Sequence, residues 1–153
     1  TIKLGTGLKT ANDFRKALKQ SECKIGDWGN NILNKPAFTT SETETEVDLV
    51  NISVAELGFE EGATRKDIYN KAKKLGLELC PNEVGPQLRL QYKDQPNSEW
   101  LRIAMEPISD SVGGLNIFVV ERHDYGLWLG GYFGYPDGFW GGYGHFVFVR
   151  PRK

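Results

Sequence analysis

Two arginines stand on the polar sides of neighbouring segments in the middle of the chain. Arg89 lies in residues 87–92 and Arg102 in residues 100–106, and both segments alternate apolar with polar residues. Alternation of this kind predicts half-buried strands, and the short Asp- and Pro-containing connection between them predicts a hairpin. Paired strands would bring Arg89 and Arg102 together on the non-core face. Two adjacent guanidiniums there would suit a carboxylate or phosphate ligand.

The same region carries residue types suited to acid and base catalysis. Glu106 ends the second segment, and His123 and His145 are the two histidines of the chain. A metal-independent hydrolase of the ribonuclease type would use Glu106 as general base, His123 or His145 as general acid, and an arginine to stabilise phosphorane charge. The alternative is structural: Glu106 or Glu121 forms plain cross-strand ion pairs with the arginines, and the histidines lie on solvated turns.

Aromatic residues and glycines are concentrated in residues 125–148. Trp128 there, and Tyr92 at the end of the first segment, could stack against a ligand. The same residues could instead fill a core or form a self-association surface, because exposed aromatic strands pair with other chains. The aromatic residues of this segment are Tyr125, Trp128, Tyr132, Phe133, Tyr135, Phe139, Trp140, Tyr143, Phe146 and Phe148.

Composition excludes several other functions. The net charge of −1 gives no overall attraction to nucleic acid or anionic membranes. Cys23 and Cys80 are far apart, so the sequence predicts no disulfide framework, no metal site and no cofactor, and Cys80 is expected to be a buried small hydrophobe. Neither an apolar run of spanning length nor a signal-peptide core occurs in the sequence, which predicts a cytoplasmic protein.

The first half of the chain predicts helices. Thr10 with Asp13 begins one helix, and residues 25–33 form a shorter second one that Gly26 and Gly29 weaken. Thr64 with Asp67 begins a third, which ends at Gly76; its expected buried stripe is Ile68, Ala72 and Leu75.

Strands are predicted mainly in the second half of the chain. Residues 47–54, 77–80, 87–92, 100–106, 117–121, 127–131 and 145–150 show alternation or β-rich composition, and Tyr135 to Gly138 is a turn. The expected fold is α+β in a single domain over residues 1–153. A helical part at about 10–76 would pack on a β-rich part at about 77–150. Two or three helices would cover a largely antiparallel sheet of five to seven strands, which could curl into a partial barrel.

Two blocks, LGLELCPNEVGPQLRLQY at residues 75–92 and EWLRIAMEPI at residues 99–108, resemble a family of uncharacterised bacterial proteins. The resemblance implies a bacterial cytosolic origin and no established activity. The sequence therefore favours a non-enzymatic binding or protein-interaction module that uses the polar sheet face around Arg89, Tyr92 and Arg102, with Trp128 contributing. The expected partner is a protein, a second copy of the chain, or a small polar or anionic ligand. A membrane partner is not expected, and nucleic acid is disfavoured.

Overall fold

A computed structural model describes residues 1–123 and 126–152, and it confirms the α+β class. The elements within the described residues are β1 (Ile2–Leu4), α1 (Ala11–Gln20), β2 (Cys23–Ile25), α2 (Asp27–Leu33), β3 (Thr45–Ser53), β4 (Ala63–Thr64), α3 (Arg65–Lys74), α4 (Val84–Gln91), β5 (Trp100–Ile103), β6 (Ile108–Ser109), β7 (Leu115–His123), β8 (Gly126–Phe133), β9 (Phe139–Trp140) and β10 (His145–Arg150).

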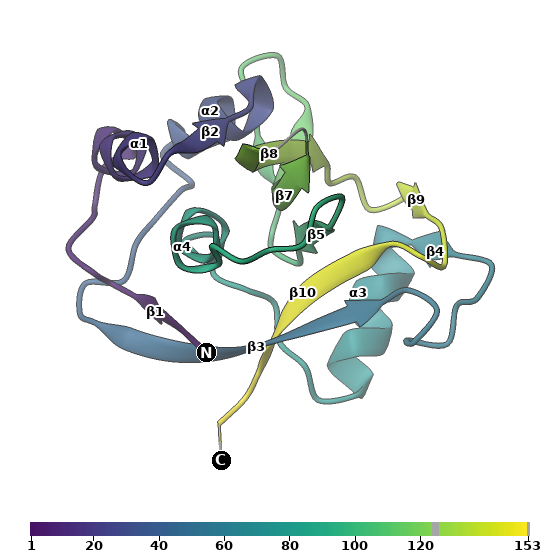
Figure 1. Ribbon diagram of the computed structural model, residues 1–153. Helices are drawn as coiled ribbons and strands as arrows, with labels where there is room; N and C mark the ends of the chain where they lie inside the picture. The colour runs from purple at the N-terminus through teal and green to yellow at the C-terminus, as the bar shows by residue number, and fades with distance from the viewer. Residues whose placement is uncertain (124–125, 153) are drawn as a thin grey trace.

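The large sheet has the strand order β1-β3-β10-β5-β7-β8-β2 and curls into a half-barrel, with α4 in its hollow (Figure 1). Most neighbours are antiparallel, but β10 runs parallel to β5 and β2 runs parallel to β8. The prediction of a largely antiparallel sheet is therefore only partly right. Both parallel pairs join strands that are distant in sequence, so no short turn forces them to run antiparallel.

The described residues form four helices rather than two or three, and local signals identified two of them correctly. Thr10 and Asp13 form the reciprocal cap of α1, and the Thr64 hydroxyl accepts the Asp67 amide at the start of α3. These caps satisfy backbone N–H groups that the first helical turn leaves without partners. Gly76 follows α3 at a φ of 87°, a left-handed conformation that favours glycine.

Other local predictions need correction. Ile25, the first residue of the second expected helix, is instead the last residue of strand β2, and α2 begins only at Asp27. The expected strand 77–80 contributes a single bridge, between Glu78 and Val149. In α3, Leu75 is exposed and Tyr69 takes its place in the buried stripe.

The segment predicted as strand 87–92 is helix α4, so the predicted hairpin with 100–106 is wrong. Pro86 is tolerated because it lies in the first turn, where its missing N–H costs no helical hydrogen bond. An eight-residue helix is marginal alone, and packing stabilises it. Residues 84–89 are all buried, and a β-carbon on Gly85 would lie 2.6 Å from the Phe118 ring.

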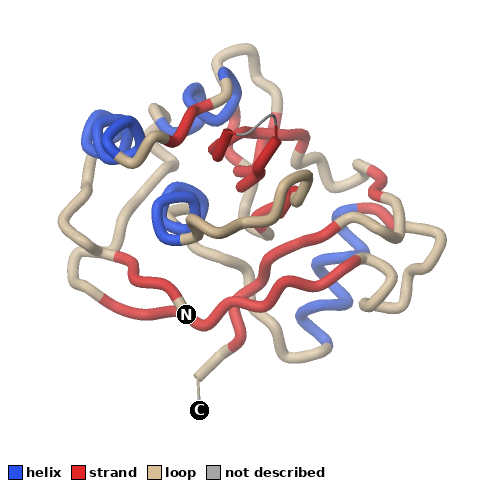
Figure 2. The backbone as a smooth tube through the Cα atoms, viewed as in Figure 1, coloured by secondary structure: helices blue, strands red, loops and turns tan. Residues whose placement is uncertain are grey.

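The two faces of the sheet differ in what covers them. Leu101 of β5 lies beside Leu88 of α4 and faces the hollow. Since side chains alternate along a strand, Trp100 and Arg102 point to the outer face. Helix α3 packs on that outer face at β10 (Figure 2). There the Tyr69 ring meets the rings of Phe146 and Phe148 edge-on.

The outer face over β5, β7 and β8 carries partly exposed side chains instead: Trp100 is 38% exposed and Tyr132 is 42% exposed. Beside it, β4 and β9 form a separate two-stranded sheet that holds Trp140. Among the described residues, none of the helices has the length and apolar character needed to cross a bilayer.

Candidate functional site

Arg89, predicted to bind a ligand, lies inside the protein at 0% exposure. Its guanidinium donates to Gln95 Oε1 at 2.6 Å, to the Glu121 carbonyl at 3.0 Å and to the Tyr92 carbonyl. Burial lowers its pKa, since desolvation disfavours the charged form. These bonds fasten α4 to β7 and to the loop after Tyr92. In this structure Arg89 holds the fold together and does not reach a surface where a ligand could lie.

Tyr92 lies on the opposite side of the sheet from Arg102. It lines a cavity on the α4 side together with Leu88, Leu101 and Val147. Burial, reinforced by a hydrogen bond to Glu99, raises the pKa of Tyr92 to about 12. The predicted cluster of Arg89, Tyr92 and Arg102 therefore does not form, because it required residues 87–92 to be a strand.

Arg102 faces a hollow on the outer side of the sheet. Two adjacent cavities, of about 380 and 350 Å³, share Arg102, Tyr143 and Gly144 in their walls. We call their combined surface the Arg102 groove; its lining residues are Ser98, Glu99, Trp100, Arg102, Tyr132, Phe133, Gly138, Phe139, Trp140, Gly141, Tyr143, Gly144 and His145.

The guanidinium of Arg102 lies over the Trp140 ring, 4.6 Å from its centre. Its Nε is buried and has no hydrogen-bond partner among the described residues. None of the ion pairs formed among those residues includes Arg102. Burial lowers its pKa, and the attraction of Tyr132 and Glu121 offsets this only in part. Arg102 is thus a partly buried cation whose strongest described contact is an aromatic ring.

Glu121 and His123 lie on β7, on the same outer face as Arg102. Trp100 pairs with Glu121 and Glu121 with Trp128, and directly opposed residues share a face. His123 Nε2 is 3.3 Å from Glu121 Oε1, and its ring stacks on Trp128 with centres 5.1 Å apart. Burial raises the pKa of Glu121, although His123 and Arg102 oppose that rise. Trp128, predicted to bind a ligand, therefore borders a Glu–His pair.

The structure does not bring Glu106 to either histidine. Glu106 is exposed beyond the end of β5. Both histidines lie near the opposite end of β5: His145 pairs with Leu101, and His123 lies two residues beyond Glu121, the partner of Trp100. His145 Nδ1 lies 2.9 Å from Asn51 Oδ1. The carboxylate that contacts a histidine on the Arg102 face is therefore that of Glu121, whereas the sequence led us to expect Glu106 there.

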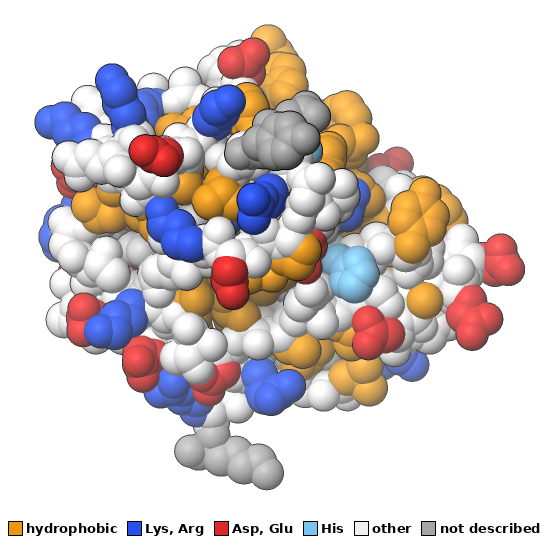
Figure 3. Space-filling model, viewed as in Figure 1, with side chains coloured by type: hydrophobic (Ala, Val, Ile, Leu, Met, Phe, Trp, Pro, Cys, Tyr) orange, Lys and Arg blue, Asp and Glu red, His pale blue; other side chains and the backbone are white. Residues whose placement is uncertain are grey.

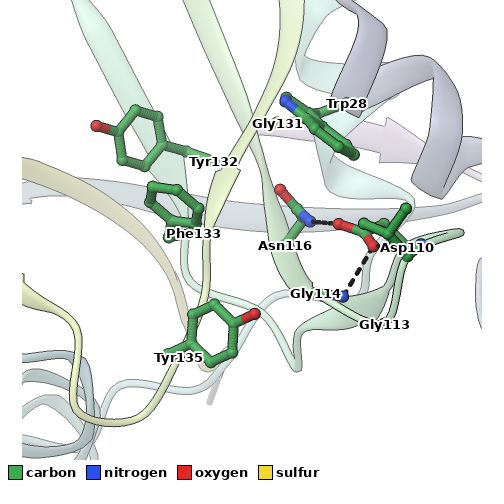
Figure 4. A pocket seen from close by; sticks show the side chains of 10 residues that line it. Trp28, Asp110, Gly113, Gly114, Asn116, Gly131, Tyr132, Phe133 and Tyr135 are labelled. Atoms are coloured by element: carbon green, nitrogen blue, oxygen red, sulfur yellow. Dashed lines mark hydrogen bonds between the residues drawn. The ribbon is translucent and has the colours of Figure 1, made fainter.

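A second hollow, the aromatic cleft, lies where β7 begins and β8 ends (Figure 4). Its volume is about 430 Å³, and its walls are Trp28, Asp110, Val112, Gly113, Gly114, Asn116, Gly131, Tyr132, Phe133 and Tyr135. Asn116 donates to Asp110 Oδ2 at 2.6 Å, as the dashed line in Figure 4 shows. Tyr132 and Phe133 belong to both the cleft and the Arg102 groove.

Sequence reasoning missed Asp110, Asn116 and Trp28 as site residues. The available signal was Asp110 directly before Ser-Val-Gly-Gly at 111–114, a sequence typical of a turn, because aspartate side chains bond to backbone N–H groups of turns. Trp28 gave no signal of its own, since it comes from α2 in the distant N-terminal part. Tyr125, included in the predicted aromatic segment, lies outside the described residues.

Hydrophobic and basic side chains are unevenly distributed over the visible surface. In Figure 3, hydrophobic side chains gather along the upper right of the molecule, whereas Lys and Arg gather at the upper left over α1.

The described residues contain no group of three or more His, Cys, Asp and Glu side chains that could hold a metal ion. In comparisons with known proteins, no family model, curated protein or solved structure matched this chain.

Proposed function

We propose that this protein is a non-enzymatic binding module whose Arg102 groove holds an anionic group attached to a flat apolar body. The observation that carries the proposal is the environment of Arg102, a partly buried guanidinium whose Nε has no partner among the described residues. Arg102 also has no ion-pair partner among the described residues, and burying a cation without one costs free energy. A ligand carboxylate or phosphate that accepted hydrogen bonds from its terminal N–H groups in the groove would lower that cost.

The walls of the groove favour a flat body next to the anion. Trp100 lines one cavity beside Arg102 and is partly exposed; Phe139 lines the other, Tyr143 lines both, and these two are strongly exposed. Aromatic residues and arginine dominate binding energy in many interfaces, and aromatic rings bury large areas at a small entropic cost. An aryl phosphate or aryl carboxylate would match both features.

The four tryptophans allow a direct test. Trp100 and Trp140 line the groove, whereas Trp28 lines the aromatic cleft. Two-dimensional NMR of the indole N–H groups, assigned with Trp→Phe variants, would follow titration with phenyl phosphate. Benzyl alcohol serves as the neutral probe. We expect the Trp100 and Trp140 signals to shift with phenyl phosphate and to respond much more weakly to benzyl alcohol.

Arg102→Gln should weaken phenyl phosphate binding about tenfold or more, because a hydrogen bond to a charged group contributes about 1.5–3 kcal/mol. Arg152→Gln is the matched control, since Arg152 is exposed and pairs with Asp48 and Glu46 away from the groove. Equal affinity in the wild type and Arg102→Gln would refute the proposed function.

The exposed aromatic residues would also suit a second copy of the chain, which is the self-association alternative. Sedimentation velocity on the wild type and a Phe139→Ser, Tyr143→Ser double variant distinguishes the two. A dimer in the wild type that is lost in the variant would favour self-association. A monomer at high micromolar concentration would favour the small ligand.

One observation favours an enzymatic alternative, namely the contact between Glu121 and His123 on the same face as Arg102. In a metal-independent ribonuclease, Glu121 would be the general base, His123 the general acid and Arg102 the phosphate ligand. RNA cleavage in EDTA by the wild type and by Glu121→Gln tests this. Equal background RNA cleavage by the wild type and Glu121→Gln would exclude the hydrolase.

A further inference from the structure

The aromatic cleft contains one formal charge among its described lining residues, the carboxylate of Asp110. Asp110 is only 8% exposed. Its Oδ1 accepts backbone N–H groups from Val112 at 2.9 Å and Gly114 at 2.8 Å, and its Oδ2 accepts Asn116 Nδ2. Burial opposes ionisation, but these bonds outweigh it and lower the pKa of Asp110. The carboxylate is therefore charged at neutral pH.

No basic side chain among the described residues lines this cleft. Lys35 is near enough to lower the pKa of Asp110 through space. Its Nζ, however, donates to Ser111 Oγ at 2.8 Å, and Lys35 does not line the cavity. A carboxylate has about four lone-pair sites, and the hydrogen bonds from Val112, Gly114 and Asn116 occupy three of them. Asp110 can still accept a donor or attract a cation from inside the cleft.

Aromatic rings make up much of the remaining wall. Trp28 comes from α2, Tyr132 and Phe133 from the end of β8, and Tyr135 from the following turn (Figure 4). The Tyr132 and Phe133 rings meet edge to face at 5.2 Å, and Phe133 and Tyr135 lie 6.3 Å apart. The face of an aromatic ring carries negative potential and attracts cations, most strongly when water is excluded.

We propose that the aromatic cleft binds an organic cation with a quaternary or methylated ammonium group, which would lie among the aromatic rings and face Asp110. A bare metal ion does not suit this site, because it needs several oxygen or nitrogen ligands and only one carboxylate is available. A neutral saccharide suits it less well, because Asp110 and Asn116 already bond to each other. The inference is independent of the proposed anion site.

The test compares choline with 3,3-dimethylbutan-1-ol, its neutral isostere, in which carbon replaces the ammonium nitrogen. Indole N–H NMR would follow Trp28, which is 48% exposed and lines the cleft. We expect choline to shift the Trp28 signal and the isostere to bind about tenfold or more weakly. Equal affinity for the two probes, or no response to choline at 50 mM, would overturn the inference.

Two variants locate the site. Asp110→Asn removes the charge, while its Oδ1 can still accept the Val112 and Gly114 amides; choline affinity should fall about tenfold. Trp28→Ala changes a half-exposed side chain and should lower the affinity about threefold to thirtyfold, the range expected for a cation–π contact. Asp94→Asn, an exposed carboxylate outside the cleft, is the control.

Wild-type choline affinity in Asp110→Asn would refute the role of the charge. Circular dichroism shows whether Asp110→Asn folds. If it does not, Trp28→Ala and the isostere comparison test the proposed site instead. Wild-type choline affinity in Trp28→Ala would then overturn the site. Failure of this inference is distinguishable from failure of the anion site, because Trp28 reports on the cleft and Trp100 and Trp140 report on the groove.

Discussion

Replacing Arg89 by leucine tests whether this side chain is structural. The guanidinium donates to Gln95 Oε1, to the Glu121 and Tyr92 carbonyls and, at 3.5 Å, to the Trp128 carbonyl. Leucine would leave these buried or partly buried acceptors without a donor. Each hydrogen bond from a charged group contributes about 1.5–3 kcal/mol.

The sum of those bonds overstates the loss, because leucine also removes the cost of burying a cation. A buried acceptor left without a donor typically costs about 1–3 kcal/mol, and with several such acceptors we expect a decrease of about 3–5 kcal/mol in the free energy of unfolding. A domain of ordinary stability has about 5–15 kcal/mol in total, so Arg89→Leu should be folded only marginally.

Urea denaturation followed by tryptophan fluorescence measures the effect, through the transition midpoint and slope. Arg89→Lys keeps the charge but not the planar fork, and it should fall between the wild type and Arg89→Leu. Arg152→Gln, at an exposed position, should leave the midpoint nearly unchanged. Wild-type stability of Arg89→Leu combined with lost phenyl phosphate binding would refute the structural role and return Arg89 to the binding site.

Three further substitutions or reactions test the packing of the fold. Gly85→Ala should destabilise the protein by about 1–3 kcal/mol in urea, because the new β-carbon would meet Phe118 at 2.6 Å. Tyr69→Phe should cost about 1–3 kcal/mol, since the Tyr69 hydroxyl bonds both the amide and the carbonyl of Met105. Cys80 is buried, and burial raises the pKa of its thiol. A thiol reagent at pH 8 should therefore modify Cys80 only at the rate of unfolding; rapid reaction, located by mass spectrometry, would contradict its burial.

The helices α1 and α3 were predictable because their signals are local. Each begins at a threonine whose side chain bonds an amide three residues later, and α3 is followed by a glycine in a left-handed conformation. Helix α4 was not predictable in this way. Leu88, Leu90 and Tyr92 all contact the core although they are spaced two apart. A short helix inside a half-barrel meets neighbours on several sides, so its apolar pattern need not follow a helical period.

The candidate site was only partly predictable because it depends on strand pairing over long sequence distances. The alternation in residues 100–103 correctly predicted that Arg102 faces away from the core side chains of β5. Which residues surround Arg102 depends on β10 lying beside β5 and on β9 holding Trp140 near the sheet. No turn signal encodes these pairings, so Glu106 could not be distinguished from Glu121 as the carboxylate nearest the histidine.

Two glycines, one in α2 and one in β8, allow the backbones of these elements to pack closely together. Gly29 counted against a helix, yet a β-carbon there would lie 2.8 Å from the Leu129 carbonyl oxygen, and one on Gly131 would lie 3.0 Å from the Gly29 nitrogen. The two backbones approach this closely only because both residues lack side chains. Trp28 precedes Gly29, and Tyr132 follows Gly131. The glycine contact therefore sets the distance between the opposite walls of the aromatic cleft, and glycine enrichment near β8 reflects this packing requirement rather than disorder.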